Sequence, residues 1–114
     1  KSEKPLRSET AFAHMKPGMI IANPSRGGVI DEKALLNALN SGQVHAVGLD
    51  VFEQEPPSSK LELCNRDDTL LSPHIAGLTD KASERMALAC IDNAINYLKG
   101  TISPNLIVNK EALL

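Results

Sequence analysis

Three side chains that can bind an acid or move a proton follow separate apolar runs of the sequence: Arg26, Glu55 and His74. Arginine offers a planar fork of N–H donors that can hold a carboxylate through two hydrogen bonds. Histidine exchanges a proton near neutral pH, and a neighbouring carboxylate can fix its tautomer. If the fold brings the three residues together, they can bind an organic acid and transfer one proton on it.

Each of these residues also has a structural explanation. Arg26 can pair with nearby Asp31 or Glu32, because arginines at sheet edges commonly form ion pairs. A single loop histidine is more often an ordinary surface residue, and Glu55 lies in an acidic loop where solvated charges are the default. Asp50 ends an apolar run and should be buried, so its carboxylate needs donors from loop backbone or from a ligand amide.

The elements that position these residues follow from the apolar pattern. Short apolar runs predict strands at residues 19–23, 44–52 and 69–72. Helical spacing and end signals predict helices at residues 8–15, 31–41 and 79–99. The first run, MIIAN, is continuous and suits a strand that is covered on both faces, as in a parallel sheet. A strand, a helix and a strand joined by short connections predict a right-handed parallel crossover.

These elements predict an α/β fold: half of a doubly wound (Rossmann) parallel sheet, with three short parallel strands and helices. Ligands of such sheets bind outside the carboxyl ends of the strands. Because all three ends lie on one edge, Arg26, Asp50, Glu55 and His74 are expected to converge there. The glycine pair after Arg26 is expected to let the backbone turn and to leave room for a ligand.

The composition argues against several classes of binding partner. The 114 residues carry a formal net charge of −2 and no basic stripe, so nucleic acid is not expected. No apolar run approaches the roughly 20 residues that cross a membrane. Cys64 and Cys90 have no metal-ligand spacing, so we predict reduced thiols, no metal site and a cytoplasmic location. The sequence begins at a lysine without a signal pattern, which indicates part of a longer protein.

The chain strongly resembles the D-isomer-specific 2-hydroxyacid dehydrogenases in three ordered motifs. These are MIIANPSRGGVIDE, VGLDVFEQEP and LLSPHIAGLT, within a match from about Met15 to Gly77. The family includes phosphoglycerate, glyoxylate/hydroxypyruvate and D-lactate dehydrogenases. The resemblance implies hydride transfer between NAD, with NADP possible, and a small 2-oxo or 2-hydroxy acid. Phosphoglycerate is the first expected substrate, and glyoxylate or hydroxypyruvate is the second.

The resemblance also implies roles for single residues. Arg26 is expected to bind the substrate carboxylate and carbonyl, and His74 to be the acid/base. Glu55 is expected to pair with His74, and Asp50 to contact the nicotinamide amide. The cofactor-binding positions implied in this way are Pro24, Ser25, Arg26, Asp50, His74, Ile75, Ala76 and Gly77.

Some features of the sequence depart from the family. Pro24 stands where relatives often have a small or sulfur-containing residue, and Ala76 where they often have glycine. The sequence contains no GxGxxG phosphate loop. We therefore interpret residues 1–100 as the C-terminal half of a dinucleotide-binding domain and residues 101–114 as a tail toward a substrate domain. The whole enzyme is expected to be a homodimer.

Two other hypotheses remain open. Dehydrogenase-like corepressors also resemble this family, and they sense dinucleotide while they contact other proteins. Alternatively, these residues form an inactive fragment. Half a Rossmann sheet leaves an exposed strand edge, so such a fragment is expected to pair with another copy or to aggregate.

Overall fold

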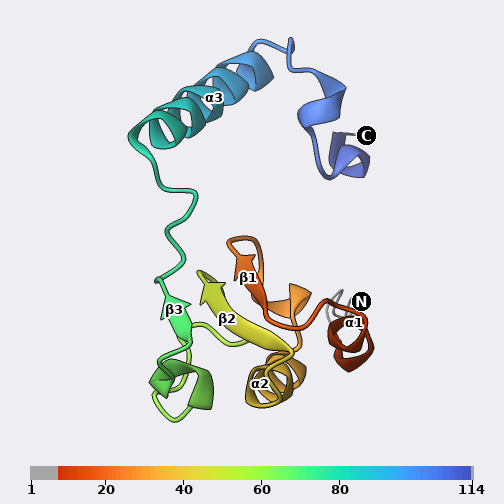
Figure 1. Ribbon diagram of the computed structural model, residues 1–114. Coiled ribbons are helices and arrows are strands. Elements are labelled where there is room, and N and C mark those ends of the chain that lie inside the picture. The colour runs from red at the N-terminus through yellow and green to blue at the C-terminus, as the bar shows by residue number, and fades with distance from the viewer. Residues whose placement is uncertain (1–7, 114) are drawn as a thin grey trace. The chain divides into compact units, whose positions relative to one another are not determined.

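The structure, a computed structural model, describes residues 8–113. The described chain forms two compact units that divide between Gly77 and Leu78. The first unit contains the three strands, and the second contains the long C-terminal helix (Figure 1). The division into residues 1–100 and 101–114 stays a prediction, and residues 1–7 of the predicted domain lie outside the described part.

A parallel three-stranded sheet forms the centre of the first unit, with the order β1-β2-β3. The strands are β1 (Met19–Asn23), β2 (Val44–Leu49) and β3 (Thr69–Leu71). This arrangement confirms the predicted α/β fold class. β2 ends earlier than residue 52, because the Phe52 N–H donates to the Glu55 carboxylate (3.1 Å) and not to a neighbouring strand.

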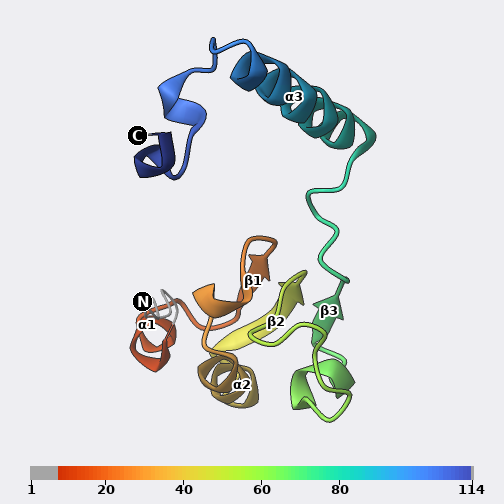
Figure 2. The ribbon, with the colours of Figure 1, turned by 180° about the vertical axis from the view of Figure 1, so that it is seen from behind.

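The helix between the first two strands, α2 (Glu32–Asn40), begins where the sequence predicts. The Asp31 carboxylate accepts a hydrogen bond from the Ala34 N–H (2.8 Å) and so satisfies one free donor of the first turn. The preceding helix, α1 (Glu9–Ala13), is shorter than predicted. Figures 1 and 2 both show α2 beneath β2, with α1 beside α2.

The core lies between α2 and one face of the sheet and is mainly aliphatic, and both phenylalanines, Phe12 and Phe52, belong to it. Leu35 of α2 packs there with Val47 and Leu49 of β2. On the opposite face Ile20 is 69% exposed and Leu70 is 78% exposed. Within the first unit, helices α1 and α2 cover only the Leu35 side, so the predicted covering of the first strand on both faces is not met there.

The second unit is built around α3 (Asp80–Leu98), whose limits lie within one residue of the prediction. The Thr79 hydroxyl accepts from the Ala82 N–H (3.1 Å) and caps the helix. Short 3₁₀ turns follow at Pro104–Leu106 and Lys110–Leu113. None of the described helices has the length and apolar character that crossing a membrane requires.

Candidate active site

The loop after β1 is organised by Asn23, whose side chain is buried at the end of the strand. The Asn23 amide group donates to the Arg26 carbonyl oxygen (2.9 Å). The amide oxygen accepts from the Ser25 backbone N–H (3.2 Å) and hydroxyl (2.7 Å). Sequence analysis missed this residue, although an asparagine that follows an apolar run and precedes Pro-Ser is a known turn signal.

Arg26 forms no ion pair with any carboxylate in the part of the chain that the structure describes. The guanidinium donates instead to the Ser25 carbonyl oxygen (2.7 Å). The two carboxylates considered as its partners are engaged elsewhere. Asp31 caps α2, and Glu32 accepts from the Glu53 N–H (2.7 Å) while the Glu53 carboxylate accepts from the Glu32 N–H (3.0 Å). The structural ion-pair explanation of Arg26 is not observed.

The two glycines after Arg26 have different surroundings. A Cβ atom on Gly27 would lie 1.8 Å from the Phe52 carbonyl oxygen and 2.6 Å from the Glu53 nitrogen. A Cβ atom on Gly28 would meet nothing within 4 Å. The expectation that both glycines leave room for a ligand is therefore wrong for Gly27, because its missing side chain admits the backbone of the loop after β2.

Asp50 follows β2 and is only 5% exposed, as predicted for an aspartate that ends an apolar run. Its carboxylate accepts hydrogen bonds from the Ser72 hydroxyl and from the N–H groups of Ile75 (2.9 Å) and Ala76 (2.8 Å). These bonds, that from Ser72 first, lower the pKa of Asp50. Sequence analysis considered loop backbone and a ligand amide as donors to Asp50, and the loop backbone is observed. A carboxylate has about four lone-pair directions, so one direction remains for a further donor. Sequence analysis also missed Ser72.

His74 and Glu55 meet although 19 residues separate them. Nδ1 of His74 lies 2.8 Å from Oε2 of Glu55, and the other Glu55 oxygen accepts from the Phe52 N–H. The hydrogen bond from His74 is the largest cause that lowers the pKa of Glu55, and the positive charge of Arg26 contributes to the same shift. The structure thus brings His74 and Glu55 into contact and places Arg26 within electrostatic reach of Glu55.

Two pockets lie at this edge of the sheet. One of about 330 Å³ is lined from all three strand ends and includes Asn23, Pro24, Asp50, Ser72 and Ala76. The other, about 160 Å³, is lined by Asp50, Glu55 and His74 together with Phe52, Pro56, Pro57 and Pro73. Four predicted cofactor-binding residues line neither pocket: Ser25, Arg26, Ile75 and Gly77.

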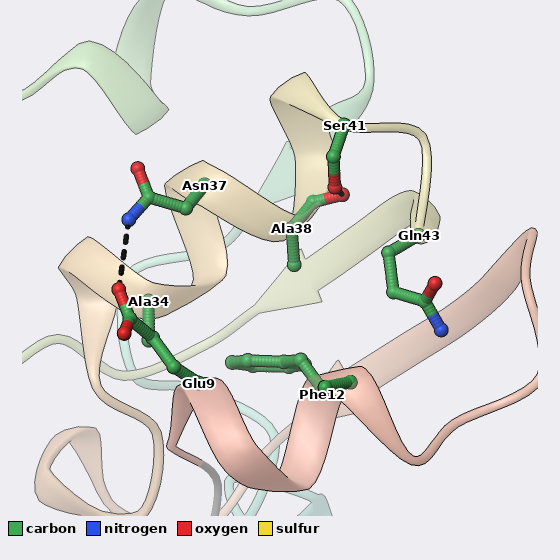
Figure 3. A pocket seen from close by; sticks show the side chains of 8 residues that line it. Glu9, Phe12, Ala34, Asn37, Ala38, Ser41 and Gln43 are labelled. Carbon is green, nitrogen blue, oxygen red and sulfur yellow. Dashed lines mark hydrogen bonds between the residues drawn. The ribbon is translucent and has the colours of Figure 1, made fainter.

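A third cavity, about 370 Å³, lies between α1 and α2, away from the predicted residues (Figure 3). The Phe12 ring projects toward it, and its polar side chains already bond to protein atoms. Asn37 donates to Glu9 (3.1 Å), Ser41 to the Ala38 carbonyl, and Gln43 to the carbonyl oxygen of Met15. Each polar side chain that lines this cavity thus makes at least one hydrogen bond within the protein.

Comparison with known proteins agrees with this geometry. A family model described as D-isomer specific 2-hydroxyacid dehydrogenase, NAD binding domain, matches residues 1–76. Glyoxylate/hydroxypyruvate reductase B from Cronobacter sakazakii is 43% identical over 116 residues, which covers 96% of this chain and 36% of the relative. The chain spans about a third of the length of the curated relatives it matches.

Solved structures give the same assignment. A glyoxylate reductase from Paecilomyes thermophila has a TM-score of 0.75 at 41% identity, and the match covers 82% of this chain and 28% of that one. A D-isomer specific 2-hydroxyacid dehydrogenase from Xanthobacter autotrophicus in complex with NADPH and MES has a TM-score of 0.75 at 33% identity, covering 85% and 39%. The chain belongs to the D-isomer specific 2-hydroxyacid dehydrogenase family, and its residues 1–76 match the NAD-binding domain of that family.

Proposed function

We propose that the protein containing this chain is an oxidoreductase that transfers a hydride between a nicotinamide dinucleotide and a small 2-oxo or D-2-hydroxy acid. The observation that carries the proposal is the hydrogen bond between His74 and Glu55 (2.8 Å), with the charge of Arg26 acting on Glu55. These groups supply an acid/base and a carboxylate receptor on the edge where parallel sheets bind ligands.

The proposed roles follow from the contacts. Glu55 accepts from Nδ1 of His74, which leaves Nε2 as the ring nitrogen without a hydrogen bond among the described residues. Nε2 donates a proton to the substrate carbonyl oxygen during reduction and accepts it during oxidation. Arg26 holds the substrate carboxylate and polarises the carbonyl. The negative charge of Glu55 stabilises the imidazolium form of His74, which is the form that donates the proton during reduction.

When bound, the dinucleotide supplies or accepts the hydride. The 330 Å³ pocket at the three strand ends fits its nicotinamide half, because the buried Asp50 retains one acceptor direction for a carboxamide N–H. Pro24 and Ala76 line the same pocket, and the backbone at Ser25, Ile75 and Gly77 is proposed to complete the surface. NAD is the first proposed cofactor, and NADP is the second because a related structure contains NADPH.

The relatives shift the expected substrate. Sequence resemblance put phosphoglycerate first, whereas the similar curated proteins are glyoxylate/hydroxypyruvate reductases at 42–43% identity. We therefore propose glyoxylate or hydroxypyruvate as the first substrate and phosphoglycerate as the second. Both preferred substrates are small 2-oxo acids, which suits a single arginine as the carboxylate receptor. The domain division at residue 100, the homodimer and the cytoplasmic location remain part of this proposal.

An assay of the full-length protein tests the proposal. Glyoxylate, hydroxypyruvate, phosphohydroxypyruvate and pyruvate are each incubated with NADH or NADPH, and cofactor oxidation is followed by absorbance. We expect turnover with at least one of the first two acids, and a loss of about 1,000-fold or more in His74→Asn, with cofactor binding retained.

The controls separate the alternatives. His45→Asn replaces an exposed histidine of β2 that lies away from the site, and it is expected to keep the parent rate. Near-parent activity of His74→Asn would remove His74 from the mechanism. Tight cofactor binding without turnover on any of the four acids would contradict the dehydrogenase and favour the corepressor alternative.

A further inference from the structure

Ser72 connects the end of β3 to the end of β2 through both its backbone and its side chain. Its N–H donates to the Leu49 carbonyl oxygen (3.0 Å), which extends the sheet ladder by one residue. Its hydroxyl donates to the Asp50 carboxylate. The residue is only partly exposed and lies two positions before His74. Neither the family motifs used above nor the proposed mechanism assigns it a role.

The Asp50 carboxylate holds the His74 loop from both sides. The Ser72 hydroxyl reaches it from before the histidine, and the N–H groups of Ile75 and Ala76 reach it from after the histidine. Asp50 is itself fixed, because its N–H donates to the Asn23 carbonyl oxygen (3.1 Å). One buried carboxylate therefore connects the loop after β3 to the ends of β1 and β2.

His74 needs such support. Its φ angle is +55°, in the left-handed region that residues other than glycine rarely adopt. A residue in this region keeps its conformation only when its surroundings determine it strongly. The His74 side chain is 47% exposed, so packing contributes little to its position. The hydrogen bonds to Asp50, with that from the Ser72 N–H to Leu49, hold the segments on either side of it.

We propose that Ser72 is a positioning residue for His74: through Asp50 it holds the loop in the conformation that places Nδ1 of His74 against Glu55. The inference rests on the proposed function for the catalytic role of His74 but not for its position. Ser72 is also the largest cause of the lowered pKa of Asp50, which keeps that carboxylate ionised as an acceptor. Without the hydroxyl, Asp50 holds the loop only through the two N–H groups after His74, while the backbone bond from Ser72 to Leu49 remains.

The test compares Ser72→Ala and Ser72→Thr in the full-length protein. Imidazole ¹⁵N chemical shifts of neutral histidine report which ring nitrogen carries the proton and whether Nδ1–H is hydrogen-bonded; His74→Asn assigns the signal. We expect Ser72→Ala to lose the signature of the Glu55 bond and to lower kcat about 10- to 100-fold, with KM changed less. Ser72→Thr, which keeps the hydroxyl, is expected to restore both.

Thr69→Val is the matched control, because the Thr69 hydroxyl of the same strand donates to the Leu63 carbonyl (2.6 Å) and not to Asp50. It is expected to lower stability and to leave the His74 signature unchanged. If Ser72→Ala does not fold, Ser72→Cys replaces it as a variant of similar size with a weak donor. An unchanged signature in whichever of these two variants folds, or equal loss in Thr69→Val, would overturn the proposal.

The two proposals fail differently. If no 2-oxo acid is turned over but Ser72→Ala still changes the His74 signature, the positioning role stands and the dehydrogenase proposal fails. If the parent is active and Ser72→Ala matches it in kcat and in the signature, only the positioning role fails.

Discussion

Buried polar residues at the strand ends hold the loops on which the proposed chemistry depends. Asn23 fixes the turn that carries Arg26, and Asp50 fixes the loop that carries His74. Both side chains are at least 95% buried, and every hydrogen bond they make goes to loop atoms or to Ser25 and Ser72 hydroxyls. Arg26 and His74 can therefore be held in defined positions although their own side chains are exposed.

Arg26→Lys tests the receptor role of the guanidinium. We expect kcat/KM for the 2-oxo acid to fall about 100-fold or more, because one ammonium cannot reproduce two parallel donors. Steady-state kinetics of the full-length protein measure the effect. Arg85→Lys, an exposed arginine of α3, is the matched control and should keep the parent value. Parent kinetics in Arg26→Lys would contradict the receptor role.

The Asp50 carboxylate should also shape stability in acid. The pKa of Asp50 is lowered in the folded protein, chiefly by the Ser72 hydrogen bond. The contribution of Asp50 to the free energy of unfolding is therefore present above the pKa of the unfolded chain, about 4, and is lost as the pH falls through the pKa of the folded protein. Asp50→Asn should therefore show a smaller further loss of unfolding free energy between pH 5 and pH 3 than the parent, by urea denaturation.

Glu32 supplies a contrast of opposite sign. Burial raises its pKa, with the Glu53 charge adding to the shift, so its contribution is present at low pH and is lost as pH rises through the folded value. Glu32→Gln keeps an acceptor for the Glu53 N–H and should lose more stability on acidification than the parent. The same slope in both variants and the parent would contradict both assignments.

At the scale of elements, the site depends on how closely the loop after β2 approaches the start of α2. Gly27 begins a 3₁₀ turn, and the Phe52–Glu53 backbone crosses where its side chain would be. The reciprocal bonds between Glu32 and Glu53 close the same contact from the helix side. This contact holds the Arg26 loop and the start of α2 against the segment that contains Glu55.

Gly27→Ala tests the close approach. A Cβ atom 1.8 Å from backbone oxygen cannot be relieved by a side-chain movement, so we expect a loss of about 3 kcal/mol or more in unfolding free energy. Gly28→Ala is the matched control, with open space around the new atom and an expected change within about 0.5 kcal/mol. Equal midpoints of chemical denaturation for the two variants would contradict the contact.

At the scale of the molecule, the three-stranded sheet of the first unit has β1 as one of its edge strands. The edge of β1 is unpaired among the described residues, and Ile20 lies exposed on the uncovered face. The chain covers about a third of its curated relatives, so the whole activity is a proposal. An unpaired edge strand with apolar side chains favours association with another chain.

The isolated 114-residue chain is therefore expected to self-associate, with its mean mass rising with concentration in sedimentation or light scattering. Ile20→Lys should reduce this association, because a charge on an edge strand opposes strand pairing. His45→Lys places a charge on the central strand β2 and should have less effect. A monomer at all concentrations, or equal effects of the two variants, would contradict association through β1.

Much of the architecture could be predicted from local sequence. The run MIIAN, the Asp31 cap and the Thr79 cap place β1, α2 and α3 within a residue of the structure, because these signals act over one turn or one strand. The order of the three motifs was enough to predict the family. The predicted burial of Asp50 also followed from one residue at the end of an apolar run, although the sequence left its donors open between loop backbone and a ligand amide.

Other features depend on residues that are far apart in sequence, and only the tertiary structure decided them. Gly27 meets Phe52, and Asp50 meets Ser72, across 22 or more residues. The pairing of Glu55 with His74 was predicted, but only because the family resemblance implied it. Sequence alone left Arg26 equally suited to an ion pair or a ligand, and it assigned the space beside Gly27 to a ligand. Close approach and shared hydrogen bonds exist only after parallel strand ends have met, so local patterns cannot specify them.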